Sequence, residues 1–194
     1  MIDEIELAMI LYTQGHKIKH DVAHFIKVHQ YARLIGKVEH LEEREQFILE
    51  VAAICHDIAC PLCREKYGHC EGDLQEKEGP ALVKEFLKDF NLDRGIIERA
   101  AYLVGHHHTY KDVDGLDYQI LLEADFLVNG DESNLTKEAI EKMKKNVFKT
   151  KTGGKENGKN DISGQCGYHK DRTGSCGGYA AVFYRVLWKC FYCL

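Results

Sequence analysis

A histidine and an aspartate stand side by side at positions 56 and 57. They end an apolar run, residues 52–59, whose composition predicts a buried helix. Burying a carboxylate costs free energy unless it is paired, hydrogen-bonded or bound to a metal, and both residue types bind divalent cations. His56 and Asp57 are therefore candidate metal ligands. The alternative is a core histidine that simply hydrogen-bonds to its neighbouring aspartate.

Further ligands of the same kind lie far away along the chain. His24 falls on the apolar face of a predicted helix, and Asp125 interrupts the almost entirely apolar run 120–128. A helix cap or a buried salt bridge is the alternative for Asp125, since a buried lone aspartate is uncommon. His107 and His108 continue another apolar helical face, provided that the helix persists to them.

Imidazoles and carboxylates together suit a divalent cation such as Mn²⁺, Fe²⁺, Co²⁺, Ni²⁺, Zn²⁺ or Mg²⁺. Four ligands on one ion leave positions for water and a phosphate oxygen; they are His24, His56, Asp57 and Asp125. Such an ion acidifies water and neutralises phosphoryl charge. Asp57 could orient or deprotonate that water, which makes it the candidate catalytic residue. One ion is expected, and a second, bridged by Asp57, is possible if His107 and His108 take part.

Helical periodicity accounts for most of the chain. The patterns predict helices over residues 2–12, 19–35, 41–59, 80–90, from 93 towards the histidines at 106–108, 118–129 and 136–148. Cys60-Pro61 is predicted to close the third helix, residues 62–78 to form a loop over its end, and Pro80 to begin the fourth helix. The fold expected is an all-α bundle of about six to seven helices over residues 1–152, followed by an irregular tail, 153–194.

The segments around His24, around His56 and Asp57, and around Asp125 resemble the HD-domain phosphohydrolase superfamily, whose signature is H…HD…D. The resemblance covers roughly residues 1–152 and looks like a small single-domain bacterial branch. It implies an all-α fold, metal ligation by these four residues, and metal-dependent hydrolysis of phosphoesters, often nucleotides.

The resemblance also bears on a second ion and on the substrate. In relatives with two ions, histidines after the fifth helix bind the second one, which here falls on His107 and His108. Many members have Gly-Lys after the His-Asp-Ile segment, whereas this chain has Ala59-Cys60. The nearest basic residues are candidates for binding a phosphate: Lys27, Arg64 and Lys66. Two acid/base candidates lie in the predicted loop: Glu76 and Glu78. The Gly-Tyr-Pro signature of the branch that cleaves cyclic dinucleotides is absent.

Composition narrows the classes of partner. The chain has 194 residues and a net charge of −5, which argues against general nucleic-acid or membrane-surface binding and leaves a small phosphorylated substrate as the expected partner. No apolar run approaches the roughly 20 residues of a membrane span. The acidic N-terminal segment lacks the charge pattern of a signal peptide, so a cytoplasmic location is expected. The sequence does not indicate the oligomeric state.

Two other functions remain open. Cys60, Cys63 and Cys70, with His69, could form a zinc-binding or redox module, although the spacing is unlike that of the usual structural zinc site. The chain could also be a catalytically inactive HD-type sensor that binds metal or nucleotide. The tail, 153–194, could be a disordered extension, a Cys-rich metal-binding appendage, or a segment not native in frame.

Overall fold

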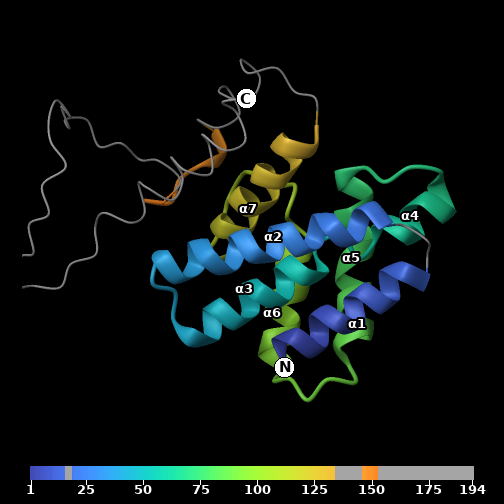
Figure 1. Ribbon diagram of the computed structural model, residues 1–194, viewed down its shortest axis with the longest axis horizontal. Coiled ribbons are helices and arrows are strands. Elements are labelled where there is room, and N and C mark those ends of the chain that lie inside the picture. Colours follow the sequence, from blue (N-terminus) through green and yellow to red (C-terminus); the bar gives the residue numbers. More distant parts are fainter. Residues whose placement is uncertain (16–18, 134–145, 153–194) are drawn as a thin grey trace, which may run out of the picture.

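The computed structural model describes residues 1–15, 19–133 and 146–152, and its regular elements there are all helices (Figure 1). They are α1 (Ile2–Gly15), α2 (Lys19–Val38), α3 (Glu43–Cys55), α4 (Cys60–Tyr67), α5 (Gly72–Leu87), α6 (Arg94–Val104) and α7 (Leu116–Glu132). The predicted all-α fold is confirmed. Most of the helix predicted over 136–148, and all of the tail 153–194, lie outside the described residues.

Helix α3 forms the centre of the bundle, because its residues 48–55 are all buried. A helix that is apolar on every side must be covered on every side. Helices α1, α2, α6 and α7 all pack against α3, and α2 also packs along α7 (Figure 1). The end of α3, where His56 and Asp57 follow, therefore lies at the meeting point of several helices.

The chain after α3 differs from the prediction. The third helix ends at Cys55 rather than Ala59, and a turn over residues 56–59 leads into α4, which was predicted to be loop. Pro61 lies in the first turn of α4, where its missing N–H costs nothing. The proline thus starts a helix instead of closing one, and Gly68, with a φ of 81°, ends it.

Helix α5 also departs from the prediction, because it begins at Gly72 and carries Pro80 in its interior. Packing outweighs the local cost of the proline. Gly79 lies so close to α6 that a Cβ there would be 2.8 Å from Val104 Cγ1, and a Cβ on Gly72 would be 2.7 Å from the His108 ring. These close approaches require the first turns of α5, so residues 72–78 are helical rather than loop.

One helical stretch in the described part of the chain, Glu43–Tyr67, is long and apolar enough to cross a membrane by length and composition. This differs from the sequence-based expectation. The stretch has a window of mean hydropathy 1.4, and 78% of that window is buried inside the protein. Core helices pass the same test, so the finding is weak evidence for a membrane span.

A buried polar network ties α1, α2 and α3 together. His29, which is 2% exposed, has Nδ1 at 2.7 Å from Glu6 Oε1 and Nε2 at 3.2 Å from Glu50 Oε2. Gln46 donates to the other oxygen of Glu50 at 2.7 Å. Burial opposes both charges, but the mutual hydrogen bonds raise the pKa of His29 and lower the pKa of Glu50. The network is therefore an ion pair that fixes α1 on the bundle.

Replacing His29 by Gln should lower the free energy of unfolding by about 2 kcal/mol near pH 6, because buried carboxylates lose a charged donor. The folded-state pKa of His29 lies above 6.5, so its contribution is complete below pH 6.5 and is lost as the pH rises through that folded-state pKa. The contribution of Glu50 is present above pH 4.5 and is lost as the pH falls through its lowered pKa.

Urea titrations of wild type and His29→Gln at several pH values measure this difference. His69→Gln, at an exposed position, is the control and should change stability little. A wild-type advantage that stays constant from pH 6 to high pH would contradict a charged His29.

Candidate metal centre

The four signature side chains converge, although they come from three separate parts of the chain. His24 Nε2 of α2 lies 3.2 Å from His56 Nε2 in the turn after α3. It also lies 3.3 Å from Asp125 Oδ1 of α7 and 3.6 Å from Asp57 Oδ2. His56 Nε2 is 3.6 Å from each of the same two carboxylate oxygens. Two ring nitrogens and two carboxylate oxygens therefore surround one small space.

The exposure of these four side chains shows from which side the site is open. His56 is fully buried, and His24 and Asp125 are nearly so. The Asp57 side chain remains 23% exposed and lines an open pocket of about 270 Å³. Asp57 and His24 are thus the members of the group that face the pocket, which a small molecule could enter.

Hydrogen bonds on the far side of each ring fix which nitrogen faces the site. His56 Nδ1 donates to the carbonyl oxygen of Ala53 at 2.8 Å, and His24 Nδ1 donates to Glu132 Oε2 at 2.8 Å. A carbonyl can only accept, so the neutral ring of His56 presents an Nε2 lone pair to the site. The four groups therefore offer mainly acceptors to one another, and a cation satisfies all of them together.

Without a cation, a proton serves this purpose. Burial disfavours a charged His24, but the hydrogen bond to Asp125 and the charge of Asp57 outweigh it and raise the pKa of His24 to about 9. Burial lowers the pKa of His56, so that ring stays neutral. Burial also opposes ionisation of Asp57, yet the neighbouring histidines hold its pKa below the ordinary value. The site thus keeps its carboxylates ionised, as a metal ligand must be.

A second group of possible ligands shares Asp57 with the first. Nitrogen and oxygen atoms of Asp57, His107 and His108 lie within 4.8 Å of one another, as do those of His24, His56 and Asp57. His107 Nδ1 donates to the carbonyl oxygen of Val104 at 2.7 Å, and His107 Nε2 lies 3.7 Å from Asp57 Oδ1. Asp57 therefore turns Oδ2 towards the first group and Oδ1 towards the second.

The two histidines of the second group are otherwise unsatisfied. His107 Nε2 and His108 Nε2 are buried and have no hydrogen-bond partner in the described part of the chain. Buried polar atoms normally have a partner, so these two suggest a ligand. Burial and the neighbouring His107 also lower the pKa of His108 to about 4, which keeps its ring neutral and able to bind a metal.

A comparison with protein families decides the family. The HD-domain model matches residues 21–147, a stretch that contains both groups of ligands. This chain belongs to the HD-domain family. A search of curated proteins and a search of solved structures gave no match. HD domains bind divalent metals, and in this one the two His/Asp groups could hold them.

In this HD domain the turn that carries His107 and His108 is held from two sides. Their place on the apolar helical face depended on the helix persisting to them, and it ends at Val104. Tyr118 of α7 donates its hydroxyl to the carbonyl oxygens of His106 and Thr109 at 2.7 and 2.6 Å. Glu76 of α5 accepts from the backbone N–H of His108 at 2.9 Å and from the Thr109 hydroxyl. Glu76, predicted as an acid/base candidate, thus orients this turn.

Two polar residues of α7 were missed by the sequence analysis. Glu132 orients His24, and Asn129 donates to Asp125 Oδ1 at 2.8 Å. Together with Asp125 they follow one helical face at spacings of four and three, which could have revealed them. The predicted helix ended at Asn129, and this hid Glu132.

The three basic candidates have different surroundings. Arg64 lines the pocket and pairs with Asp21 through both guanidinium nitrogens. Lys27 pairs with Glu132 at 3.1 Å, and Lys66 pairs with Glu78 at 3.0 Å. Neither lysine lines the pocket, whose full lining is Asp21, His24, Asp57, Cys60, Arg64, Cys70, Gln75, Asn129, Glu132 and Ser133.

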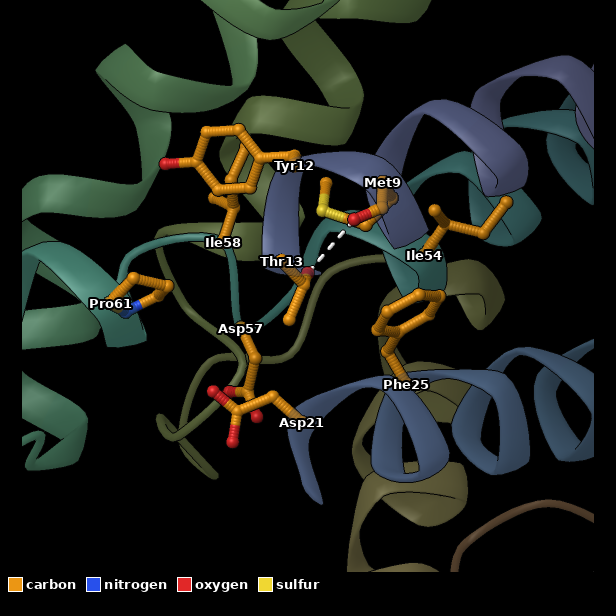
Figure 2. A pocket seen from close by; sticks show the side chains of 9 residues that line it. All are labelled: Met9, Tyr12, Thr13, Asp21, Phe25, Ile54, Asp57, Ile58 and Pro61. Carbon is orange, nitrogen blue, oxygen red and sulfur yellow. Dashed lines mark hydrogen bonds between the residues drawn. The ribbon is translucent and has the colours of Figure 1, made fainter. Parts of the chain in front are cut away.

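Apolar side chains support Asp57 from its other side. Figure 2 shows the side chains that line a small cavity, in which Asp21 and Asp57 lie beside Ile54, Phe25 and other, mostly apolar residues. Its volume of about 10 Å³ is at most enough for one water. A cavity this small cannot admit a substrate, so the open pocket is the side from which the site is reached.

Replacing Glu132 by Gln should weaken Mn²⁺ binding by about 10- to 100-fold. The reason is that the substitution removes the charged carboxylate that accepts the hydrogen bond of His24 and orients its ring. Isothermal titration of the metal-free protein with Mn²⁺ measures the change. Asp131→Asn is the matched control, since this neighbouring carboxylate lies 3.6 Å from Lys27 on the exposed side. Equal affinities in the two variants would show that Glu132 has no role in binding.

Proposed function

We propose that this HD domain is a cytoplasmic, metal-dependent phosphohydrolase that cleaves a small phosphorylated substrate, a nucleotide or a related metabolite. The single observation that carries the proposal is the convergence of His24, His56, Asp57 and Asp125 on one space beside an open pocket. The membership of the HD-domain family supports it.

The residues that would hold the first ion are His24, His56, Asp57 and Asp125, and a second ion would be held by Asp57, His107 and His108. A divalent cation supplies a Lewis acid there and lowers the pKa of bound water. The donor set of imidazoles and carboxylates fits such an ion. Asp57, which contributes to both groups and faces the pocket, is placed to accept the proton of an attacking water.

Electrostatics of the pocket also favour this assignment. Asp21, Asp57 and Glu132 line it with carboxylates, and Arg64 is the one arginine or lysine in that lining among the described residues. A phosphate would be repelled by such a surface unless bound cations reversed its charge. Binding of a phosphorylated substrate in this pocket therefore requires that the metal site is occupied.

Arg64 is the side chain best placed to bind the substrate phosphate. Its guanidinium is held by Asp21, and its side chain is 41% exposed. Guanidinium groups bind phosphate oxygens through two parallel hydrogen bonds. The pocket of about 270 Å³ fits a small phosphorylated molecule rather than a polymer.

The central test replaces Asp57 by Ala. Bound Mn²⁺ and hydrolysis of a panel of nucleoside mono-, di- and triphosphates should both fall by about two orders of magnitude or more, because the shared ligand is lost. Metal analysis, phosphate release and circular dichroism measure metal content, activity and helical content. Asp73→Ala, at an exposed position on α5, should leave all three unchanged.

Two outcomes would overturn the proposal. Hydrolysis that survives in Asp57→Ala would remove the site from the reaction. A wild-type protein that binds Mn²⁺ but hydrolyses no phosphoester of the panel would instead support a sensor that binds metal or nucleotide.

A second prediction concerns the substrate. Arg64→Ala should raise KM by about 10-fold or more, since a charged hydrogen bond to phosphate contributes about 1.5–3 kcal/mol, and bound Mn²⁺ should stay unchanged. Steady-state kinetics on any substrate found in the panel measure this. Lys66→Ala is the control, because Lys66 lies on the same helix outside the pocket lining. An unchanged KM in Arg64→Ala would assign phosphate binding to other residues.

A further inference from the structure

Two cysteines on the pocket wall lie unusually close together. The Sγ atoms of Cys60 and Cys70 are 2.6 Å apart, although ten residues separate them along the chain. Cys60 opens α4, and Cys70 stands two residues before α5. Cys60 lies at the start of α4 and Cys70 in the connection that follows this helix, and both thiols line the same pocket as Asp57 and His24.

We propose that Cys60 and Cys70 form a reversible disulfide on the wall of this pocket when the protein meets a peroxide. The thiols are free in the structure, and a disulfide bond of about 2.0 Å requires only a small further approach. Disulfides of intracellular proteins are usually transient and redox-sensing rather than structural. The inference goes beyond the proposed hydrolysis and does not depend on it.

Exposure and hydrogen bonding indicate that Cys70 is oxidised before Cys60. Cys60 is 3% exposed, whereas Cys70 is only half-buried, so a peroxide reaches Cys70 first. When Cys70 loses its proton, the Cys60 thiol donates a hydrogen bond to the thiolate, and this lowers the pKa of Cys70. The thiolate is the reactive form of cysteine. Burial and the charge of Asp57 oppose the thiolate, whereas Arg64, on the helix between the two cysteines, favours it, and the pKa of Cys70 is lowered on balance.

The chemistry balances with hydrogen peroxide as the oxidant. The Cys70 thiolate attacks one peroxide oxygen, the O–O bond breaks, and a sulfenic acid forms while the second oxygen leaves as water after protonation. The Cys60 sulfur then attacks the sulfenic sulfur, the S–S bond forms, and the hydroxyl group leaves as a second water. Two thiols are oxidised by two electrons, and one peroxide is reduced to two waters. A dithiol reductant reverses the change.

Neighbouring cysteines provide controls. Cys63 follows one turn after Cys60 on α4 and is fully buried, and Cys55 is buried at the end of α3. Burial raises the pKa of both thiols, so neither should be oxidised first. The test must therefore tell Cys60 from two cysteines close to it in sequence.

The sequence makes this test direct. Trypsin cleaves after Arg44, Arg64, Lys66 and Lys77, so Cys70 is the single cysteine of peptide 67–77, while peptide 45–64 contains Cys55, Cys60 and Cys63. The full-length protein is treated with hydrogen peroxide, alkylated without reduction, digested and analysed by mass spectrometry. A linked pair of these two peptides should be the main form of peptide 67–77, with the mass of both minus two hydrogens and plus the alkyl groups on Cys55 and Cys63.

Variants identify the partner. Cys63→Ser should retain the link at the wild-type level, and Cys60→Ser and Cys70→Ser should lose it. Dithiothreitol should restore two free peptides in the wild type. Three results would each overturn the proposal. Peptide 67–77 could remain fully alkylated after peroxide treatment, or it could be linked to a cysteine of the tail. It could also be linked in Cys60→Ser to the same extent as in the wild type.

Discussion

The candidate metal centre depends on several hydrogen-bond acceptors that face one another in a small, largely buried space. Asp57 and Asp125 are held ionised beside ring nitrogens that present lone pairs, and the dielectric around them is low. Such an arrangement is costly unless positive charge lies between the groups. In the protein alone, a proton on His24 supplies part of that charge. A divalent cation would supply all of it, and the two His/Asp groups could hold one.

The carbonyl groups at the ends of two helices, α3 and α6, find hydrogen-bond donors at the same site. The last carbonyl groups of an α-helix have no partner within the helix. His56 donates to the carbonyl of Ala53, and His107 donates to the carbonyl of Val104, in each case three residues earlier. Each helix end thereby gains a donor, and each ring is oriented with Nε2 towards Asp57. Breaking α3 and α6 just before the histidines is therefore part of how the site is built.

The break after α3 also organises the pocket. Because α4 begins within a few residues of Asp57, this short helix brings Cys60 and Arg64 to the pocket wall, and the segment that follows it brings Cys70 to the same wall. Asp57, Arg64 and both cysteines consequently lie within one continuous segment of chain, residues 57–70. A change in the geometry of α4 would move these side chains together.

The sequence alone determined the residue types and the class of fold. The helical periods, the apolar surroundings of the His-Asp pair and the polar interruption at Asp125 are local patterns, and they predicted an all-α bundle with a His/Asp group. It also placed His24 on an inward face, because the side-chain direction repeats with the helical turn.

Only the tertiary structure decided the partners. Nothing local shows that Glu132 reaches His24, that His29 bonds to Glu6 and Glu50, or that Cys70 meets Cys60. Local patterns also gave the wrong result at Pro61, which lies in the first turn of α4 instead of closing the preceding helix, and at Pro80, where the packing of α5 outweighs the cost of a proline inside a helix. The physical reason is that a period along the chain fixes the face on which a side chain lies, whereas its contacts depend on which other helix covers that face.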